Sequence, residues 1–532
     1  MSSEIPLRRL LTTFMVLFIV ISGTLVYWQV GQSQSLIDSP YRRCISSEQP
    51  QRGRILDRNG IVLAWSEPDS ASPCGWRRRY ATAKHPSISS FLGYFSYVYG
   101  STGLERYYDD VLTGKNNPTD FNDASNQFWN RTLHQTIYGA DIYLSVDVTV
   151  QDKLDAIFTQ QVTGGVCTSG SAKGSIIAED PHTGQLLGVL SRPYYDGDKI
   201  GDTHPAPDNA DMTIGQEYWH AIATNPDALL LNRALSGHYP PGSTMKTLTL
   251  IAALDSGKYT IDSTFSENDA KHFVVDGFHI DSNNLGDYAR GPVPPSFPLD
   301  LAHAYAYSDN VVFARVGASI GPEIWLDYAR RFSMATPDQP QAVQLDTAPL
   351  PVSFAYTRAP FGATDLAVTA YGQGQLLLTP MTMTMIAGAV AADGMLAQPH
   401  FLLKIVPHNS DPQTVPVVDL GQPQRVFSSQ TAQGVRRAMR DVVTFGSVGT
   451  SGGVIAGVAN STTYIGAKTG TAQTGVDGAP HAWFISIAPD HEANNDGHAL
   501  ASVIMKEQGG EGACQAPIAQ KLYEFALPLV GS

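Results

Sequence analysis

The hydrophobic positions in the second half of the chain follow strand-like and helix-like patterns in turn. Two apolar stretches, 174–179 and 185–190, flank a polar turn, which is typical of a hairpin with buried strands. Further apolar runs of strand length occupy 464–471, 481–488 and 499–506. Helix-like periodicity is found at 150–161, 243–255, 310–319, 380–392, 432–443 and 515–527. Strands at both ends with helices between them predict an α/β (α+β) domain over 146–532, in which one mixed sheet is flanked by helices and carries an inserted all-helical lobe.

The preceding region, 31–145, has shorter apolar runs separated by turns rich in glycine, asparagine and aspartate. The segment Asp57-Arg58-Asn59-Gly60 lies between two apolar pairs, a pattern that predicts a β-hairpin. A short helix is predicted over 103–114, where it ends at a glycine. We therefore expect a mostly β pedestal domain that lifts the larger domain off a membrane.

An almost uncharged apolar run, 10–28, comes still earlier and is long enough to span a bilayer. Two arginines precede it and a tyrosine and a tryptophan end it, as at membrane interfaces, although two arginines on its far side weaken the orientation signal. No small-residue cleavage site follows, which favours an uncleaved anchor over a signal peptide. We expect a single-pass cell-membrane protein with a cytoplasmic tail at 1–9, an anchor at 10–30 and the larger domain outside the cytoplasm. A buried core helix is the alternative interpretation of this run.

Composition and charge narrow the class of protein. Of the 532 residues, 43% are hydrophobic and 16% are charged, which is typical of a globular chain. The net charge of −14 argues against a nucleic-acid binder. The cysteines Cys44, Cys74, Cys167 and Cys514 show no C-x-x-C spacing, so no zinc site and no other metal is expected. Cys44–Cys74 with Cys167–Cys514 is one of three disulfide pairings outside the cytoplasm, and free buried thiols are the alternative.

The strongest chemical signal is a serine and a lysine one helical turn apart. Proline and glycine precede Ser243, and an apolar stretch follows Lys246. Side chains three positions apart share one helical face, so the amine of Lys246 reaches the hydroxyl of Ser243 and takes its proton. The helix start adds backbone N–H groups and a positive dipole end that favour developing negative charge. Taken alone the pair is common, and a capped helix with a solvated lysine is the alternative.

Two partner motifs follow in order and complete a known catalytic set. Ser308-Asp309-Asn310 lies on a turn that opens a helix, and Lys468-Thr469-Gly470 lies at the end of a predicted strand. Two other Ser-x-Asn triplets begin at Ser266 and Ser282. Both lie in polar segments, and we predict that they are surface turns.

Each residue of the catalytic set has an expected role. Ser308 relays a proton between Lys246 and the departing amine. Lys468 places a second positive charge nearby, which favours a neutral, basic Lys246. With Ser243 as nucleophile, these residues predict acyl transfer through a covalent serine intermediate, without a metal or an organic cofactor.

The remaining site residues are expected to contact the substrate. The side-chain amide of Asn310 holds Lys246 and binds a peptide substrate. Thr469 and Thr471 bind a substrate carboxylate, and Gly470 permits close backbone approach. The N–H groups of Ser243 and Thr471 are expected to form the oxyanion hole.

With these motifs the chain resembles the class B penicillin-binding proteins, the single-pass peptidoglycan D,D-transpeptidases of bacteria. The likeness covers nearly the whole chain. Its further motifs are Arg52-Gly53-x-Ile55-x-Asp57-Arg58-Asn59-Gly60, Gly103-Leu104-Glu105, Asn232-Arg233-Ala234, Gly372-Gln373-Gly374 and His481-Ala482-Trp483-Phe484. The resemblance implies a pedestal followed by a domain of the penicillin-binding transpeptidase and serine β-lactamase-like fold. It also implies cross-linking of peptidoglycan stem peptides in cell-wall synthesis, covalent inhibition by β-lactams, and a polytopic membrane glycosyltransferase partner from the elongation or division machinery.

Two departures from that family pattern and three other functions remain to be weighed. Met245 stands where the family often has phenylalanine, and the segment 214–231 is longer than usual and is expected to shape the substrate site. A β-lactamase of the same fold would need a positioned carboxylate; Glu323 is the candidate, and we predict that it is a solvated helix-start residue. A D,D-carboxypeptidase would differ only in letting water compete with the acceptor amine. A non-catalytic membrane scaffold or β-lactam sensor has no need for Lys246 and Lys468 together.

Overall fold

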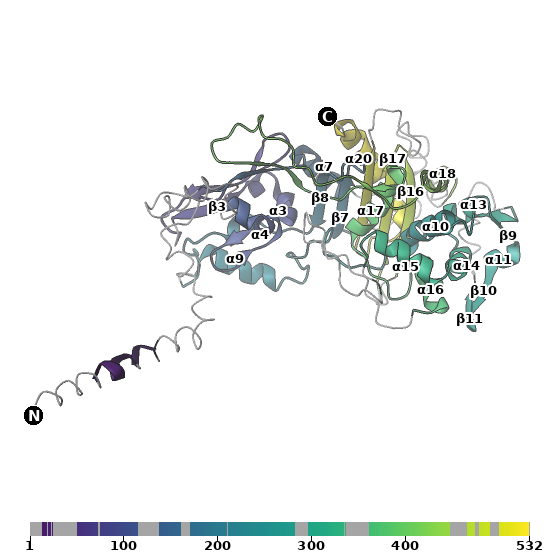
Figure 1. Ribbon diagram of the computed structural model, residues 1–532, viewed down its shortest axis with the longest axis horizontal. Coiled ribbons are helices and arrows are strands. Elements are labelled where there is room, and N and C mark those ends of the chain that lie inside the picture. Colours follow the sequence, from purple (N-terminus) through teal and green to yellow (C-terminus); the bar gives the residue numbers. More distant parts are fainter. Residues whose placement is uncertain are drawn as a thin grey trace, which may run out of the picture.

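The computed structural model describes residues 13–18, 20–22, 24, 51–72, 75–114, 138–160, 171–209, 211–281, 296–334, 336, 361–446, 465–473, 478–489 and 499–530. These residues form a smaller part around the N-terminal sheet and a larger part around the central sheet. A helical lobe lies on the far side of the central sheet from the smaller part (Figure 1).

The larger part is built on a five-stranded sheet with the order β16-β17-β18-β7-β8. Its strands are β7 (Gly174–Glu179), β8 (Leu186–Arg192), β16 (Gly466–Ala472), β17 (His481–Ala488) and β18 (Leu500–Lys506). The predicted hairpin and the three other predicted strands are confirmed. The predicted mixed sheet is wrong, because every pairing is antiparallel. The long helical insertion connects β8 and β16, which lie at opposite edges, so it imposes no parallel neighbours.

Helices pack on this sheet where the sequence predicts them. They are α7 (Val148–Phe158), α17 (Pro380–Ala391), α18 (Ser429–Thr444) and α20 (Ala516–Ala526), while α10 (Lys246–Asp255) packs on α18 and on helices of the inserted lobe. Helix α17 packs on β7, β17 and β18, while α7 and α20 contact each other and the sheet. The caps explain the helix starts: Asp147 accepts from two N–H groups of α7, and Thr379 accepts from the third residue of α17, whose first residue is proline.

The lobe inserted between β8 and β16 is helical but not all-helical, so that prediction needs correction. Its helices are α11 (Glu267–Lys271), α13 (Leu301–Ala306), α14 (Asn310–Ile320), α15 (Pro322–Arg331) and α16 (Ala363–Ala370). It also holds two small antiparallel sheets, made of β9 (Thr264–Phe265) with β12 (Leu299–Asp300), and β10 (His272–Val275) with β11 (Phe278–Asp281). Asp276 and Gly277 connect the latter pair with positive φ angles, which is the conformation of a two-residue hairpin turn.

The smaller part has its own sheet, with the order β14-β6-β1-β2-β3. The strands are β1 (Ile55–Leu56), β2 (Val62–Pro68), β3 (Trp76–Tyr80), β6 (Asp141–Leu144) and β14 (Leu402–Val406), and short helices α3 (Ser89–Leu92), α4 (Gly103–Tyr107) and α5 (Asp109–Leu112) accompany them. The predicted hairpin at 57–60 is confirmed, since β1 pairs antiparallel with β2. Strand β14 comes from the second half of the chain, so the smaller sheet is completed by the larger part. The exact division at 145/146 stays a prediction.

A buried ion-pair cluster explains two motifs of the smaller part. Glu105 is fully buried in α4, and its two carboxylate oxygens accept from Arg52 at 2.8 Å and from Arg78 at 2.6 Å. These pairings keep the pKa of Glu105 below its usual value although burial acts in the opposite direction. The motifs that contain Arg52 and Glu105, far apart in sequence, therefore meet inside one domain.

The first part of the segment 214–231 lies away from the serine turn, so the expectation that this segment shapes the substrate site is wrong for 214–223. It begins with α9 (Ile214–Ala223), which lies beside α4 and away from α10 in Figure 1. Trp219 of α9 stacks on Tyr99 at 4.4 Å and meets Tyr94 edge-on at 5.6 Å. Because its aromatic face is buried against the smaller part, the extra length strengthens the junction between the two parts.

The predicted anchor and disulfides fall largely outside the described residues. Within the ranges given above, no helix is both long and apolar enough to cross a membrane. Cys514 is disulfide-bonded, which excludes a free thiol there. Cys44, Cys74 and Cys167 lie outside the described residues, so the pairing stays a prediction.

A buried carboxyl group gives the fold a testable pH dependence. Glu179 in β7 is 1% exposed, and its Oε2 has no hydrogen-bond partner among the described residues. Burial, and secondarily the charge of Asp180, raises the pKa of Glu179 to about 8. The folded protein thus keeps this group protonated where the unfolded chain ionises it. Its contribution to stability is complete below the unfolded pKa and is lost as the pH rises towards 8.

We therefore expect Glu179→Gln to gain stability over the wild type as the pH rises. The difference in unfolding free energy should grow by about 1.4 kcal/mol for each pH unit between pH 5 and pH 8. Thermal unfolding of both proteins across this range measures it. A difference that does not change with pH would mean that Glu179 ionises in the folded protein.

Candidate active site

Ser243 lies on a single 3-10 turn, η5 (Gly242–Met245), that leads directly into α10. The predicted continuous helix from 243 therefore begins one turn later, at Lys246. Gly242 has a φ of +55°, a conformation that favours glycine. Met245 beneath the serine is fully buried, so the residue that departs from the family pattern is part of the core.

The amine of Lys246 is the centre of the site. Lys246 is fully buried, and its Nζ lies 2.7 Å from Ser243 Oγ and 2.7 Å from Asn310 Oδ1. The same nitrogen lies 3.0 Å from the backbone oxygen of Ser308 and 3.2 Å from its Oγ. Four oxygen atoms from three residues thus surround one amine.

Ser308 occupies the turn between α13 and α14 in an unusual backbone conformation. Its φ is +62°, which is uncommon for a residue with a side chain. The following residue, Asp309, caps α14 by accepting from the N–H of Val312 at 2.9 Å. The turn directs both the carbonyl and the hydroxyl oxygen of Ser308 towards Lys246. Holding a non-glycine residue in this conformation costs energy, which is typical of functional sites.

Lys468 approaches the same hydroxyl from β16. Its Nζ lies 2.9 Å from Ser308 Oγ and donates to the backbone oxygen of Thr469 at 3.1 Å. Lys468 is fully buried, and its amine faces the ring of Tyr305 at 5.5 Å, an arrangement that stabilises a cation. Ser308 Oγ therefore bridges the two lysine amines, as the proton-relay role requires.

Close backbone packing brings β16 beside the serine turn. A side chain on Gly470 would lie 2.9 Å from the backbone oxygen of Pro241, and one on Gly242 would lie 3.0 Å from that of Thr471. The lack of a side chain at Gly470 therefore permits the close approach of the serine turn. The N–H groups of Ser243 and Thr471 consequently belong to adjoining backbone segments, as an oxyanion hole requires.

Two further glycines complete this packing. A Cβ on Gly372 would lie 1.7 Å from the backbone oxygen of Gly242, and a Cβ on Gly512 would lie 2.6 Å from that of Gly470. Gly372 belongs to the Gly-Gln-Gly motif that the sequence analysis noted, but the motif did not indicate what this glycine does. No sequence signal marks Gly512, because only the tertiary structure places it against β16.

The predicted substrate-binding residues differ in exposure. Asn310 and Thr471 are exposed, Gly470 is buried and Thr469 is 7% exposed. Asn310 belongs to α14 and Thr471 to β16. The two threonines and Asn310 therefore keep their substrate roles as predictions.

Burial also affects the acid next to Ser308. Asp309 is 5% exposed, and its Oδ2 has no hydrogen-bond partner among the described residues. Burial raises the pKa of Asp309 to about 6, with hydrogen bonds from the start of α14 and the nearby Lys246 acting in the opposite direction.

The competing motif at Ser266 lies on the surface. Ser266 caps the short exposed helix α11, rather than forming only a turn as predicted, and its hydroxyl donates to Asp269. Ser282 lies outside the described residues. Glu323 is an exposed residue in the first turn of α15, which confirms the prediction of a solvated helix-start residue.

Comparisons with known proteins agree with this geometry. A family model of the penicillin-binding protein transpeptidase domain matches residues 174–524, and a model of the penicillin-binding protein A dimerisation domain matches residues 52–135. The chain therefore belongs to the penicillin-binding protein transpeptidase family, and the resemblance inferred from its motifs is confirmed.

Individual relatives cover almost the full chain. The chain is 30% identical over 534 residues to the peptidoglycan D,D-transpeptidase PbpA of Mycolicibacterium smegmatis, with 98% of each protein covered. The imipenem acyl-enzyme structure of penicillin-binding protein A from M. tuberculosis has a TM-score of 0.70 and 25% identity, and covers 91% of this chain and 100% of that one. The D,D-transpeptidase domain from Eggerthella lenta, at 23% identity and a TM-score of 0.68 over 91% of this chain and 99% of that one, shares the fold.

The bridge between the lysines predicts a specific kinetic defect. Ser308→Ala removes the hydroxyl that contacts both amines, so proton transfer to the departing amine should fail. We expect acylation by a β-lactam to slow by roughly 10²–10⁴-fold, the usual contribution of general acid–base catalysis. Stopped-flow measurement of acylation tests this.

The matched control is Ser266→Ala, which removes the serine hydroxyl of another Ser-x-Asn triplet. It should acylate at the wild-type rate. An equal loss in both variants, or none in Ser308→Ala, would contradict the relay role.

Proposed function

We propose that this protein is a peptidoglycan D,D-transpeptidase that cross-links stem peptides through an acyl-enzyme on Ser243. The observation that carries the proposal is the buried amine of Lys246, 2.7 Å from the hydroxyl of Ser243. A neutral amine suits the arrangement, because it donates to two oxygens and accepts a proton from Ser243.

Acylation uses the site residues in turn. Ser243 Oγ passes its proton to Lys246 and attacks the carbonyl carbon between the two terminal D-alanines. The oxyanion is held by the N–H groups of Ser243 and Thr471. As the C–N bond breaks, the proton moves from Lys246 through Ser308 to the departing nitrogen. The products are a serine ester and free D-alanine.

Transfer to the acceptor reverses these proton movements. An amine of a neighbouring stem peptide attacks the ester carbon and loses a proton to Lys246 through Ser308. The C–O bond to Ser243 breaks, Ser243 regains its proton, and a new peptide bond links the two stems. During acylation, Asn310 donates to a peptide carbonyl of the donor stem, and Thr469 and Thr471 bind the carboxylate of its terminal D-alanine. No step needs a metal, and no group of three or more potential metal ligands lies together within the described residues.

A β-lactamase is disfavoured, because the candidate carboxylate among the described residues is not suitably placed. Glu323 is exposed on α15, which is not the place of a base that positions water at Ser243. A D,D-carboxypeptidase would use the same residues, so the acceptor decides between the two reactions.

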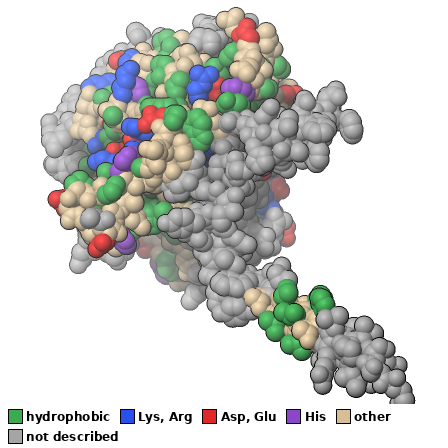
Figure 2. All heavy atoms as spheres, turned by 90° about the vertical axis from the view of Figure 1, so that its left-hand side faces the viewer, with side chains coloured by type: hydrophobic (Ala, Val, Ile, Leu, Met, Phe, Trp, Pro, Cys, Tyr) green, Lys and Arg blue, Asp and Glu red, His purple; other side chains and the backbone are tan. Residues whose placement is uncertain are grey.

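We also propose that the chain is anchored in the cell membrane, with 1–9 cytoplasmic and the catalytic part outside. The described helical residues near the N-terminus project from the rest of the molecule, and hydrophobic side chains cover them (Figure 2). Phe14, Leu17 and Phe18 are more than half exposed there, which water disfavours and lipid favours. A polytopic membrane glycosyltransferase contacting the anchor and the smaller part is the expected partner.

The reaction itself gives the direct test. The purified protein is incubated with a stem-peptide thioester, with and without an amine acceptor. We expect cross-linked dimer in the presence of the acceptor. Hydrolysis that is unaffected by the acceptor would instead indicate a carboxypeptidase.

A covalent label identifies the nucleophile in the same preparation. A fluorescent penicillin should label the wild type and not Ser243→Ala. Labelling that persists in this variant would exclude Ser243 as the acylated residue, and an unlabelled wild type would favour the scaffold.

A further inference from the structure

A carboxylate behind the active site joins the segment before the nucleophile to the end of the central sheet. Glu507 directly follows β18, and its Oε1 accepts from Arg233 Nε at 2.7 Å and from the hydroxyl of Tyr239 at 2.8 Å. Arg233 and Tyr239 both belong to the stretch that leads to Ser243. One oxygen atom therefore connects the sheet to that stretch at two points.

The sheet side of this connection is held firmly. The N–H of Glu507 donates to the backbone oxygen of Lys173 at 2.9 Å, next to the start of β7. The N–H of Gln508 donates to His481 Nδ1 at 3.0 Å, at the start of β17. Glu507 thus has a fixed position relative to the strands that continue to β16 and its Lys468-Thr469-Gly470 motif.

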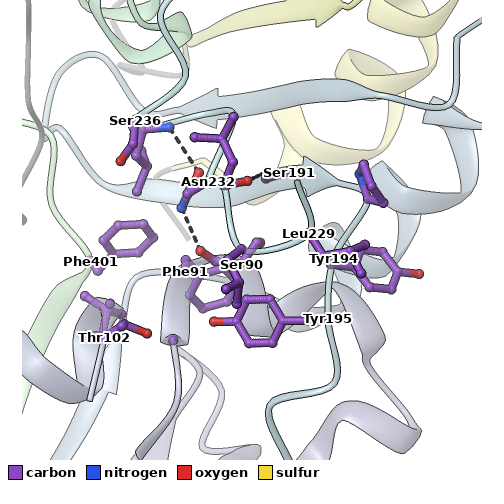
Figure 3. Close-up of a pocket in the computed structure, with 17 residues that line it drawn as sticks. Ser90, Phe91, Thr102, Ser191, Tyr194, Tyr195, Leu229, Asn232, Ser236 and Phe401 are labelled. Atoms are coloured by element: carbon purple, nitrogen blue, oxygen red, sulfur yellow. Dashed lines mark hydrogen bonds between the residues drawn. The ribbon is translucent and has the colours of Figure 1, made fainter. Parts of the chain in front are cut away.

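The Arg233 side is equally constrained. Arg233 is 2% exposed, and its guanidinium also donates to the backbone oxygens of Asp227 and Ala228. The neighbouring Asn232 donates to the backbone oxygen of Ser90 in the smaller part at 2.6 Å. Figure 3 shows the segment from Leu229 to Ser236 as one wall of a cavity of about 240 Å³ at the junction of the two parts.

Tyr239 connects the fixed position of Glu507 to the position of the nucleophile. Its backbone exchanges two 2.9 Å hydrogen bonds with Leu378, and its ring meets His481 edge-on at 5.4 Å. Burial, and then the charge of Glu507, raises the pKa of Tyr239, so its hydroxyl stays a donor. Only two prolines and Gly242 separate it from Ser243, and proline fixes φ, so little freedom remains to absorb a shift.

We propose that Glu507 is a positioning residue that sets the place of Ser243 relative to β16 through Tyr239 and Arg233. This inference rests on the proposed function, since it concerns the acylation of Ser243. Glu507 touches neither substrate nor nucleophile. Its effect is to keep the hydroxyl of Ser243 and the oxyanion-binding N–H of Thr471 at a fixed relative position. Small misplacements of such groups lower the reaction rate strongly.

The test measures acylation of the full-length protein by a fluorescent penicillin, resolved into the affinity of the non-covalent complex and the maximal acylation rate. Tyr239→Phe removes only the hydroxyl that Glu507 accepts from. We expect a maximal rate lowered by roughly tenfold, with unchanged non-covalent affinity and a thermal midpoint near the wild type. Glu507→Ala should lose at least as much, and Glu507→Gln, which keeps an acceptor oxygen, should lose less.

Tyr328→Phe is the matched control. Tyr328 is as buried as Tyr239, and its hydroxyl likewise donates to a carboxylate, Asp255, that an arginine, Arg331, also approaches. That carboxylate belongs to the last residue of α10, about 13 Å along the helix from its first residue. This variant should acylate at the wild-type maximal rate.

The outcomes separate the two proposals. Wild-type maximal rates in Tyr239→Phe and Glu507→Ala, or an equal loss in Tyr328→Phe, would overturn the positioning role while leaving the proposed function intact. A wild type that is not acylated at all would overturn the proposed function, and the positioning role with it. If Glu507→Ala does not fold, the comparison of Tyr239→Phe with Tyr328→Phe still decides.

Discussion

The buried amine of Lys246 is the group on which the arrangement of the catalytic part depends. A buried amine without polar partners costs several kcal/mol, and the oxygens that surround Lys246 come from η5, from the Ser308 turn and from α14. The fold therefore has to bring these segments together to satisfy one nitrogen. In the proposed mechanism the same contacts supply the chemistry, because the atom that needs partners is also the base that activates Ser243. Structural stability and catalytic geometry share one requirement here.

Close contact between backbones is the second requirement. The serine turn, the 372–374 segment and β16 approach so closely that side chains would not fit at Gly242, Gly372 or Gly470. Such contact lets backbone N–H groups, which are already fixed by the strands, stabilise an oxyanion without reorganisation. Glycine loses more conformational entropy on folding than other residues, and the surrounding sheet and helices compensate for that cost through extensive apolar burial.

The two parts of the molecule are interlocked rather than merely connected. Strand β14 leaves the catalytic part to complete the sheet of the smaller part, the aromatic face of α9 packs against Tyr94 and Tyr99, and Asn232 bonds to Ser90. The segment that makes the last contact continues through Arg233 and Tyr239 to the nucleophile. A displacement of the smaller part would therefore be transmitted to Ser243 through a short series of covalent and hydrogen bonds.

The sequence by itself determined the strands of the central sheet, most of its helices, and the residues that we propose to be catalytic. Apolar periodicity reports burial directly, and the three motifs carry side chains whose chemistry is specific. The tertiary structure alone decided that the central sheet is antiparallel, that β14 crosses to the other sheet, that α9 packs away from the site, and that Gly512 and Glu507 support it. These features depend on which distant segments become neighbours, and a local pattern of apolar and polar residues contains no information on such pairings.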